Sequence, residues 1–407
     1  MTWSDTRLKH LCVDSGQYGL NISADQYSST GVRLIRTSDI ASNGALKEAN
    51  EGVFVDVILD PRHQLQPGDI LLSRSGTLGR SFLVPHAADG QSYAGFLIRF
   101  RPKATVDSRF VYYATQSSPF QGTVHSEAVA STIQNFNADR YANVSLRAPE
   151  SEEQRRIADF LDAETGKIDE LVASKRRLVS LLEERIDSEV LQYVGSSLLV
   201  QPATGSPIIP LRRLLTKMVR PAVANLGIIT AYRDGQVTER GLRRAEGYTL
   251  SASADPQGQH VRVGDVVVHG LDGFAGAIGT SEASGNCSPV YHVCVPAGDG
   301  DARFLGRLLR LLALQGYLGN FATSTRERAV DFRNWDLFGR IPAPVVPAAA
   351  QREIGEMITK LRPVREAIER SETLAAERRQ ALITAAVTGQ FDVTTASGRN
   401  VTDGVQP

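Results

Sequence analysis

The octapeptide Leu65-Gln66-Pro67-Gly68-Asp69-Ile70-Leu71-Leu72 returns in diverged form as Val261-Arg262-Val263-Gly264-Asp265-Val266-Val267-Val268. In each copy a Gly-Asp pair precedes three aliphatic residues, a pattern typical of a turn that leads into a buried strand. The second copy begins 196 residues after the first, at position 261 instead of 65. In a chain of 407 residues, a repeat of this length predicts two copies of one architecture.

Further matches follow in the same order and at nearly the same offset. Phe136 falls against Phe332, and Gln154-Arg155-Arg156-Ile157 falls against Gln351-Arg352-Glu353-Ile354. Chance similarity between two stretches of mixed helix and strand is the alternative, but the shared order and offset favour a repeat. The other matches are Gly76 with Gly273, Gly79 with Gly276, Leu146 with Ile341 and Pro149 with Pro344.

Each repeat has two parts of different composition. Gly, Ser and Thr around short apolar runs predict strands and turns in the first part, whereas Ala, Leu, Glu and Arg with few helix breakers predict a long helix in the second. The predicted fold class is therefore α+β, with two α/β domains in tandem and two long helices. The predicted ranges are 1–149 for the first domain, 150–200 for the central helix, 201–346 for the second domain, 347–390 for the C-terminal helix and 391–407 for a polar tail that we expect to be disordered.

The two predicted helices carry an apolar stripe with spacings of three, four and seven residues, and such a stripe needs a facing helix to bury it. Because the helices are similar in length, we expect them to pair as an antiparallel coiled coil, with Glu164 and Lys175 as interruptions. Ordinary bundle helices within one domain are the alternative. The predicted packing residues are Ile157, Leu161, Ile168, Leu171, Leu178, Leu182, Ile354, Ile358, Leu361, Ile368 and Leu382.

The charge balance hides an uneven distribution. The chain has 45 basic and 45 acidic residues, which excludes a strongly basic histone-like protein and an acidic solubilising tail. Residues 1–149 nevertheless carry a net charge of +1 and residues 203–344 carry +4, while residues 152–189 carry −4. Both domains can therefore accept a phosphate-bearing partner, and DNA is not expected along the acidic central helix.

The sequence has little sign of catalysis. It contains no HExxH, no GxSxG, no Walker motif and no methyltransferase tetrapeptide, and its seven histidines have no metal-ligand spacing. The three cysteines form no CxxC pair, and there is no apolar leader and no run of 18 apolar residues. We therefore expect a non-enzymatic protein of the reducing cytoplasm, without a bound metal or a membrane span.

The most concentrated polar stretch is the loop Ser73–Ser81, in which glycines allow close approach to a ligand and two arginines supply charge. Arginine suits guanine edges, and Asn or Gln suits adenine edges in the major groove. A plain turn after a strand, or ordinary surface at each single residue, is the alternative. The candidate nucleic-acid contacts are Arg36, Ser38, Arg74, Ser75, Thr77, Arg80, Tyr93, Gln134, Asn135 and Asn137 in the first repeat, and Arg233, His269, Thr323 and Arg326 in the second.

The order of domain, helix, diverged domain and helix resembles the specificity subunit of type I restriction–modification systems. The likeness covers nearly the whole chain and is weaker over 205–345. The residues that carry it are Ile35–Ile40, Pro67–Gly79, Asn135–Asn137, Pro149 with Gln154–Ala158, Ile168-Asp169 and Arg379–Val393.

The resemblance implies a specific division of labour. Each domain would be a target-recognition domain that reads one half of a bipartite, asymmetric double-stranded DNA site, and the paired helices would fix the spacing and dock two modification (methyltransferase) subunits. Those partners would hold S-adenosylmethionine and flip out the adenine, and separate restriction (helicase-nuclease) subunits would use ATP and Mg. This chain would bind no cofactor itself. A coiled-coil scaffold with two ligand- or peptide-binding modules, and an orphan DNA-binding subunit in phage defence, are the alternatives.

Overall fold

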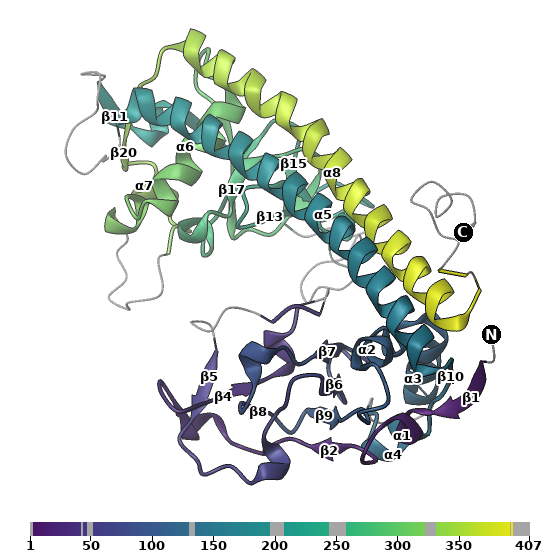
Figure 1. Ribbon diagram of the computed structural model, residues 1–407. Helices are drawn as coiled ribbons and strands as arrows, with labels where there is room; N and C mark the ends of the chain where they lie inside the picture. Colours follow the sequence, from purple (N-terminus) through teal and green to yellow (C-terminus); the bar gives the residue numbers. More distant parts are fainter. Residues whose placement is uncertain are drawn as a thin grey trace. The chain divides into compact units, whose positions relative to one another are not determined.

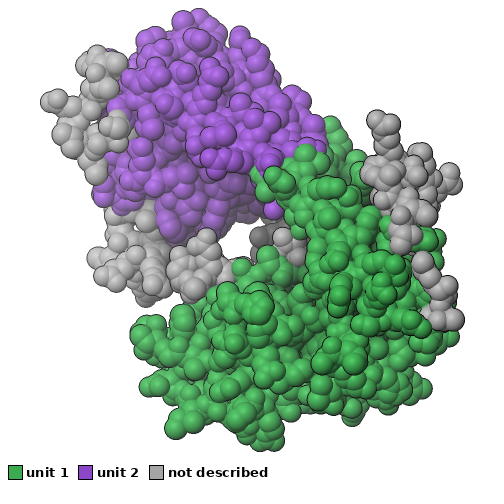
Figure 2. All heavy atoms as spheres, viewed as in Figure 1, with its two compact units in different colours: residues 1–173, 370–407 green, residues 174–369 purple. Residues whose placement is uncertain are grey.

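The computed structural model describes residues 3–41, 44–46, 52–129, 135–195, 207–243, 258–321, 331–390 and 392–393. The chain forms two compact units, unit 1 with residues 1–173 and 370–407 and unit 2 with residues 174–369 (Figure 2). The long helices α5 (Ser151–Val194) and α8 (Ala348–Thr388) each contribute one part to each unit (Figure 1). The tail predicted over 391–407 lies almost wholly outside the described residues.

Unit 1 is built on a four-stranded antiparallel sheet, in which β9 (Leu97–Phe100) lies between β2 (Gln17–Tyr18) and β6 (Ile70–Ser73), and β7 (Ser81–Leu83) pairs with the other side of β6. In the turn before β6, Gly68 has a φ of +88°, and the Asp69 carboxylate accepts the N–H of Gln66 at 2.8 Å. This turn directs β6 into the core, where all four of its residues are buried. A second sheet has the order β3-β5-β4-β8, and β1 pairs with β10.

The strands of unit 1 are β1 Ser4–Arg7, β2 Gln17–Tyr18, β3 Tyr27–Ser28, β4 Val32–Ile35, β5 Val53–Val55, β6 Ile70–Ser73, β7 Ser81–Leu83, β8 Ser92–Tyr93, β9 Leu97–Phe100 and β10 Ser145–Ala148. Its shorter helices are α1 Leu8–Leu11, α2 Ser108–Gln116, α3 Ser118–Val129 and α4 Ala138–Asn143. Its 3-10 turns include η1 Ala24–Gln26, η2 Thr37–Asp39, η4 Pro61–His63 and η5 His86–Ala88.

Unit 2 repeats this plan. Its four-stranded sheet has the order β12-β19-β16-β17, and in the turn before β16 the Asp265 carboxylate accepts the N–H of Arg262, as Asp69 does for Gln66. The octapeptides that revealed the repeat therefore occupy equivalent places. Its strands are β11 Ile208–Pro210, β12 Leu215–Met218, β13 Ile229–Ala231, β14 Val237–Glu239, β15 Gln259–Val261, β16 Val266–His269, β17 Ile278–Thr280, β18 Gly285–Cys287, β19 Tyr291–Pro296 and β20 Pro342–Pro344. Its shorter helices and 3-10 turns are α6 Ala302–Leu314, α7 Trp335–Phe338, η6 Leu211–Arg213, η7 Arg240–Leu242, η8 Gly273–Ala275 and η9 Leu318–Phe321.

A buried glutamine fastens each long helix to the domain beside it. In unit 1 the Gln154 side chain accepts the N–H of Asp107 at 3.1 Å and donates to the carbonyl of Pro149 at 2.8 Å. In unit 2 Gln351 accepts the N–H of Asp301 at 3.0 Å and donates to the carbonyl of Val346 at 2.7 Å. The matching glutamines of the repeat therefore make the same pair of hydrogen bonds.

The aspartates held by these glutamines begin a helix in each unit. Asp107 accepts the N–H groups of Arg109 and Phe110 and starts α2, and Asp301 does the same for Arg303 and Phe304 at the start of α6. Such caps satisfy N–H groups that the first helical turn leaves without a partner. Both aspartates belong to an Asp-x-Arg-Phe motif, at 107 and 301, which are 194 residues apart. This match was not among those that predicted the repeat, although the sequence contains it.

The long helices pack antiparallel within each unit, which confirms the predicted coiled coil. In unit 1, Ile157 and Leu161 of α5 share a core with Leu382 of α8, and Asp169 pairs with Arg379 at 3.8 Å. In unit 2, Glu183 of α5 forms an ion pair with Arg365 of α8. The partner in α8 thus moves back by 14 residues, from 379 to 365, as α5 advances by 14, from 169 to 183. No helix in the described ranges is both long and apolar enough to cross a bilayer.

Two residues predicted to pack in the coiled coil are misplaced. Leu171 is 51% exposed and Leu178 is 47% exposed, and Val172 and Val179 beside them are less exposed. The reason is that the more buried positions of α5 follow alternating steps of four and three residues, and polar Thr165 and Lys175 occupy two of them. Counting only apolar residues therefore moved the predicted stripe to the wrong face. The observed positions are Leu161, Thr165, Ile168, Val172, Lys175, Val179, Leu182 and Ile186.

The two tryptophans allow the glutamine contacts to be tested separately, because Trp3 lies in unit 1 and Trp335 in unit 2. In a Trp3→Phe background, Gln351→Ala should lower the free energy of unfolding reported by Trp335 by about 1–3 kcal/mol, because it leaves a buried N–H and a buried carbonyl unpaired. Urea titration followed by fluorescence measures this change. Arg352→Ala, at the exposed neighbouring position, is the control, and an equal loss in both variants would contradict the role of Gln351.

Candidate nucleic-acid interface

Arg74, directly after β6, is the centre of a polar and aromatic cluster in unit 1. Its Nε donates to Oδ1 of Asn135 at 3.2 Å, and its guanidinium lies 5.0 Å from the centre of the Tyr18 ring. Its backbone N–H donates to the carbonyl of Phe96 at 3.0 Å, and its carbonyl accepts the N–H of Phe136 at 2.9 Å. Among the described residues no protein acceptor binds Nη1 or Nη2 of Arg74, and its side chain is partly exposed. We call Tyr18, Arg74, Phe96 and Asn135 the Arg74 cluster.

The loop that follows Arg74 is held from below by Tyr141. The buried Tyr141 hydroxyl donates to the carbonyl of Ser73 at 2.7 Å and accepts the N–H of Gly79 at 3.1 Å. Gly76 and Gly79 have φ values of +74° and +76°, which favour glycine. The fixed loop leaves Thr77 exposed and Ser75 partly exposed. The Tyr141 ring itself is wholly buried.

Phe96 is a site residue that sequence analysis did not find. It is 63% exposed and precedes β9, and its carbonyl holds the N–H of Arg74. It was missed because the run Gly95–Phe100 reads as one apolar strand. The signal that could have found it is its place immediately before the strand, where an aromatic side chain has no sheet neighbour to cover it.

Several residues predicted as contacts have structural roles instead. Tyr93 is fully buried and donates to the carbonyl of Gln17 at 3.1 Å, so the prediction that it contacts a ligand is wrong. Asn137 accepts the N–H of Arg140 at 2.9 Å and caps α4. Arg80 donates to the carbonyl of Ile40 at 2.6 Å, which ties the loop to the residue that follows η2.

Arg36 and Ser38 form a separate polar feature around η2. The Asp39 carboxylate closes the turn by accepting two hydrogen bonds from Arg36, one from Nη2 and one from the backbone N–H, each at 2.9 Å. The Ser38 side chain remains exposed. Hydrogen bonding to Asp39 raises the pKa of Arg36. Neither residue is in hydrogen-bond contact with the Arg74 cluster.

In unit 2, the turn after β16 is organised by His269. Its Nδ1 accepts the N–H groups of Leu271 at 3.1 Å and Asp272 at 3.0 Å, so the ring is neutral with its proton on Nε2. Burial lowers the pKa of His269, in keeping with this tautomer. Its ring meets Tyr291 edge to face at 4.5 Å between centres. His269 is therefore a turn anchor, and the exposed Arg233 pairs with Asp272 at 2.9 Å.

The remaining predicted contacts, Gln134, Thr323 and Arg326, lie outside the described residues. The described ranges contain no group of three or more His, Cys, Asp or Glu side chains that could hold a metal ion.

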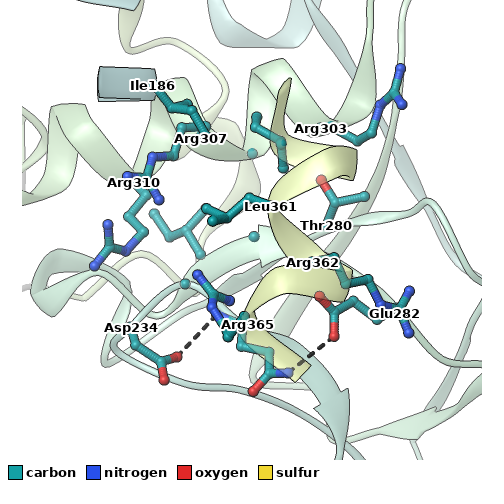
Figure 3. Close-up of a pocket in the computed structure, with 16 residues that line it drawn as sticks. Ile186, Asp234, Thr280, Glu282, Arg303, Arg307, Arg310, Leu361, Arg362 and Arg365 are labelled. Atoms are coloured by element: carbon teal, nitrogen blue, oxygen red, sulfur yellow. Dashed lines mark hydrogen bonds between the residues drawn. The ribbon is translucent and has the colours of Figure 1, made fainter. Parts of the chain in front are cut away.

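A pocket of about 90 Å³ lies in unit 2 between α5, α6 and α8, and arginines dominate its lining (Figure 3). Arg307 pairs with Asp187 and Arg365 with Glu183, so much of this charge is already neutralised. The Gln236 backbone N–H and side chain donate to Asp234 and Glu282 on the other side. The pocket is a junction of α5, α6 and α8 with charged side chains at its edge, and its two acidic residues, Asp234 and Glu282, both accept hydrogen bonds from Gln236.

Comparison with known proteins gives a consistent result. Residues 7–177 match the family model described as the type I restriction modification DNA specificity domain. A structure from a study of complex assembly and conformational transition of the type I R-M system matches with a TM-score of 0.57 and 14% identity, over 96% of this chain and 98% of that chain. Similarity at this identity is evidence for the fold only. No curated protein matches.

Two further solved structures are similar with lower scores. The HsdS subunit from Thermoanaerobacter tengcongensis has a TM-score of 0.41 and 15% identity, over 96% of this chain and 97% of that chain. The S subunit of a type I restriction-modification system from M. genitalium has a TM-score of 0.47 and 14% identity, over 95% and 96%.

The state of His269 predicts a pH dependence in unit 2. Burial lowers the pKa of His269 and of His292, whereas an unfolded histidine titrates near about 6.5. Below that pH the unfolded chain binds protons first, so the stability is complete above about 6.5 and is lost as pH falls through the folded pKa values. In the Trp3→Phe background, the urea midpoint should therefore fall between pH 7.5 and 5.5. His269→Asn keeps an acceptor for the turn without titrating and should reduce that fall, and an unchanged pH dependence would contradict the assignment.

Proposed function

Because this chain belongs to the type I restriction–modification specificity subunits, we propose that its two units each read one half of a bipartite, asymmetric DNA site. The chain is the DNA sequence-specificity subunit of such a system. Its role is to choose the sequence at which partner subunits act. The scaffold of peptide-binding modules considered from the sequence is not favoured.

One observation supports two-part reading most strongly: the units share a buried scaffold but differ in the loop at one edge of it. The strand orders β2-β9-β6-β7 and β12-β19-β16-β17 are equivalent. After β6 the chain reads Arg74-Ser75-Gly76-Thr77, and after β16 it reads Gly270-Leu271-Asp272-Gly273. A common scaffold with unlike loops is the design that two different half-sites require, because base-edge contacts carry the sequence information.

In unit 1 the Arg74 cluster would supply the base contact. Asn135 holds Nε and Tyr18 supports the guanidinium face, so the Nη1–Nη2 edge is oriented before DNA arrives. That edge matches the O6 and N7 acceptors of guanine in the major groove. The exposed Thr77 can donate to a phosphate, and Phe96 offers an apolar contact.

The long helices would separate the two readers and carry the partners. Exposed leucines occur on both helices, and apolar surface of this kind marks protein contacts. We propose that two modification subunits dock there, hold S-adenosylmethionine and methylate adenine, and that restriction subunits use ATP and Mg. This chain would contribute no catalytic group and would act in the cytoplasm. The exposed leucines are Leu171, Leu178, Leu181 and Leu374.

The first test removes the oriented arginine of unit 1. Arg74→Ala should relax one G·C pair in the first half of the methylated site, with a loss of about 1–3 kcal/mol in discrimination, and should leave the second half intact. Methylome sequencing of the source strain carrying each variant measures the motif. The control is Arg62→Ala, because Arg62 is exposed on the same unit and pairs with Asp60. Equal relaxation of both halves would contradict base reading by Arg74.

The second test shortens both helices in register. Deletion of residues 173–179 and 369–375 removes one heptad from each helix between the ion pairs Asp169–Arg379 and Glu183–Arg365. Seven residues at 1.5 Å correspond to about 10 Å, or about three base pairs at 3.4 Å each. The unread spacer of the methylated site should therefore shorten by about three base pairs with both half-sites unchanged. Deletion from α5 alone breaks the register and should abolish methylation. An unchanged spacer in the double deletion would refute the spacer role.

A further inference from the structure

The Arg74 position has an equivalent in unit 2, and the backbone hydrogen bonds identify it. Arg74 donates its N–H to the carbonyl of Phe96 and accepts the N–H of Phe136. Gly270 donates its N–H to the carbonyl of Val290 at 3.0 Å and accepts the N–H of Phe332 at 2.7 Å. Both phenylalanines are buried. Gly270 therefore occupies in unit 2 the place of Arg74, without a side chain.

The space beside Gly270 is filled by another arginine. A Cβ atom added to Gly270 would lie 2.5 Å from the carbonyl oxygen of Val290 and 2.8 Å from Cγ of Arg333, so a side chain at 270 is blocked by the backbone and by the stem of the Arg333 side chain. Arg333 follows Phe332 directly, and its side chain is 57% exposed. In unit 1 the arginine is the residue that accepts the phenylalanine N–H, whereas in unit 2 the arginine is the residue directly after that phenylalanine.

The sequence spacing explains how Arg333 reaches this place. In unit 1 the buried Phe136 is followed at once by Asn137, which caps α4. In unit 2 the equivalent Phe332 is followed by Arg333 and then by Asn334, which caps α7 by accepting the N–H of Asp336 at 2.9 Å. Arg333 is thus one additional residue between two equivalent anchors.

The residue before the phenylalanine orients the arginine in both units. Asn135 accepts Nε of Arg74 at 3.2 Å, and Asp331 accepts Nε of Arg333 at 3.0 Å and Nη2 at 2.6 Å. The hydrogen bonds from Arg333 lower the pKa of the Asp331 carboxyl, which is ionised at neutral pH. Both arginines are therefore held through the Nε side, which leaves an outer guanidinium edge for a ligand.

We propose that Arg333 is the base-reading arginine of unit 2, the counterpart of Arg74, and that it recognises a guanine in the second half-site. This inference rests on the proposed reading of one half-site by each unit. Asp331 holds the Nε–Nη2 edge, and the Nη1–Nη2 edge donates to the O6 and N7 acceptors of guanine. Arg233, by contrast, pairs with Asp272 in the turn that His269 anchors, and among the described residues it has no equivalent of the backbone contact between Gly270 and Phe332.

The test compares the methylomes of source strains that carry the full-length protein with Arg333→Ala, Arg333→Lys or Arg62→Ala. Arg62 and Asp60 form the same Asp-x-Arg contact as Arg333 and Asp331, with Nη2 to Oδ2 distances of 2.7 and 2.6 Å, so Arg62→Ala is a matched control. Arg333→Ala should relax one G·C pair in the second half-site by about ten- to one-hundred-fold and leave the first half unchanged. Arg333→Lys should also relax that pair, because an ammonium cannot form the paired contact.

The outcomes separate this inference from the proposed function. If Arg74→Ala relaxes the first half-site but Arg333→Ala leaves the second unchanged, the inference fails while two-part reading stands. If Arg333→Ala abolishes methylation and Arg333→Lys restores the wild-type motif, the residue supplies only charge, and the inference also fails. If neither Arg74→Ala nor Arg333→Ala alters the motif, the proposed function is overturned together with it.

Asp331→Asn provides a second variant that keeps the fold. It retains an oxygen acceptor for Nε, as Asn135 does in unit 1, but removes the second carboxylate oxygen that binds Nη2. Discrimination at the same G·C pair should weaken less than in Arg333→Ala, with no change elsewhere. Relaxation at a different base pair would overturn the orienting role of Asp331.

Discussion

The hydrogen bonds of two buried glutamines fix each long helix to the domain beside it. Gln154 and Gln351 each join the first turn of a long helix to the aspartate that starts a helix of the domain. In unit 1, Arg109 extends this connection to Asp159 and Asp162 of α5. The geometry between each long helix and its domain is therefore set by hydrogen bonds to buried groups. These contacts therefore fix the position of each long helix against its domain.

The buried scaffold and the exposed loops follow different constraints. β6 and β16 are nearly identical in pattern because they are buried on both sides and bounded by the same Gly-Asp turn. The residues directly after them differ, Arg74 in unit 1 and Gly270 in unit 2, although both make the same pair of backbone hydrogen bonds. A Cβ at 270 would lie 2.5 Å from the carbonyl oxygen of Val290, so this position in unit 2 requires glycine. Specificity can therefore change without loss of the fold. One example is the arginine of each unit, which is Arg74 directly after β6 in unit 1 and Arg333 directly after Phe332 in unit 2.

The repeat, the two long helices and their antiparallel pairing could be predicted from the sequence, because they depend on buried residues at regular spacing. The positions of Leu171 and Leu178 could not, because Thr165 and Lys175 occupy seam positions that a count of apolar residues passes over. Tyr93 was misassigned because an aromatic hydroxyl can find a backbone carbonyl inside the core. Arg333 was missed because its role depends on the absent side chain of Gly270, 63 residues earlier in the chain.

The zero net charge of the chain agrees with arginines that act through an oriented guanidinium and not through nonspecific attraction to DNA phosphates. Asp331 holds Arg333 through hydrogen bonds to Nε and Nη2, and this pair adds no net charge. A guanidinium oriented in this way loses less side-chain entropy on binding, which favours discrimination between bases. Nonspecific attraction to phosphates, by contrast, increases with the number of cationic contacts. A subunit that selects sequence can therefore remain neutral overall.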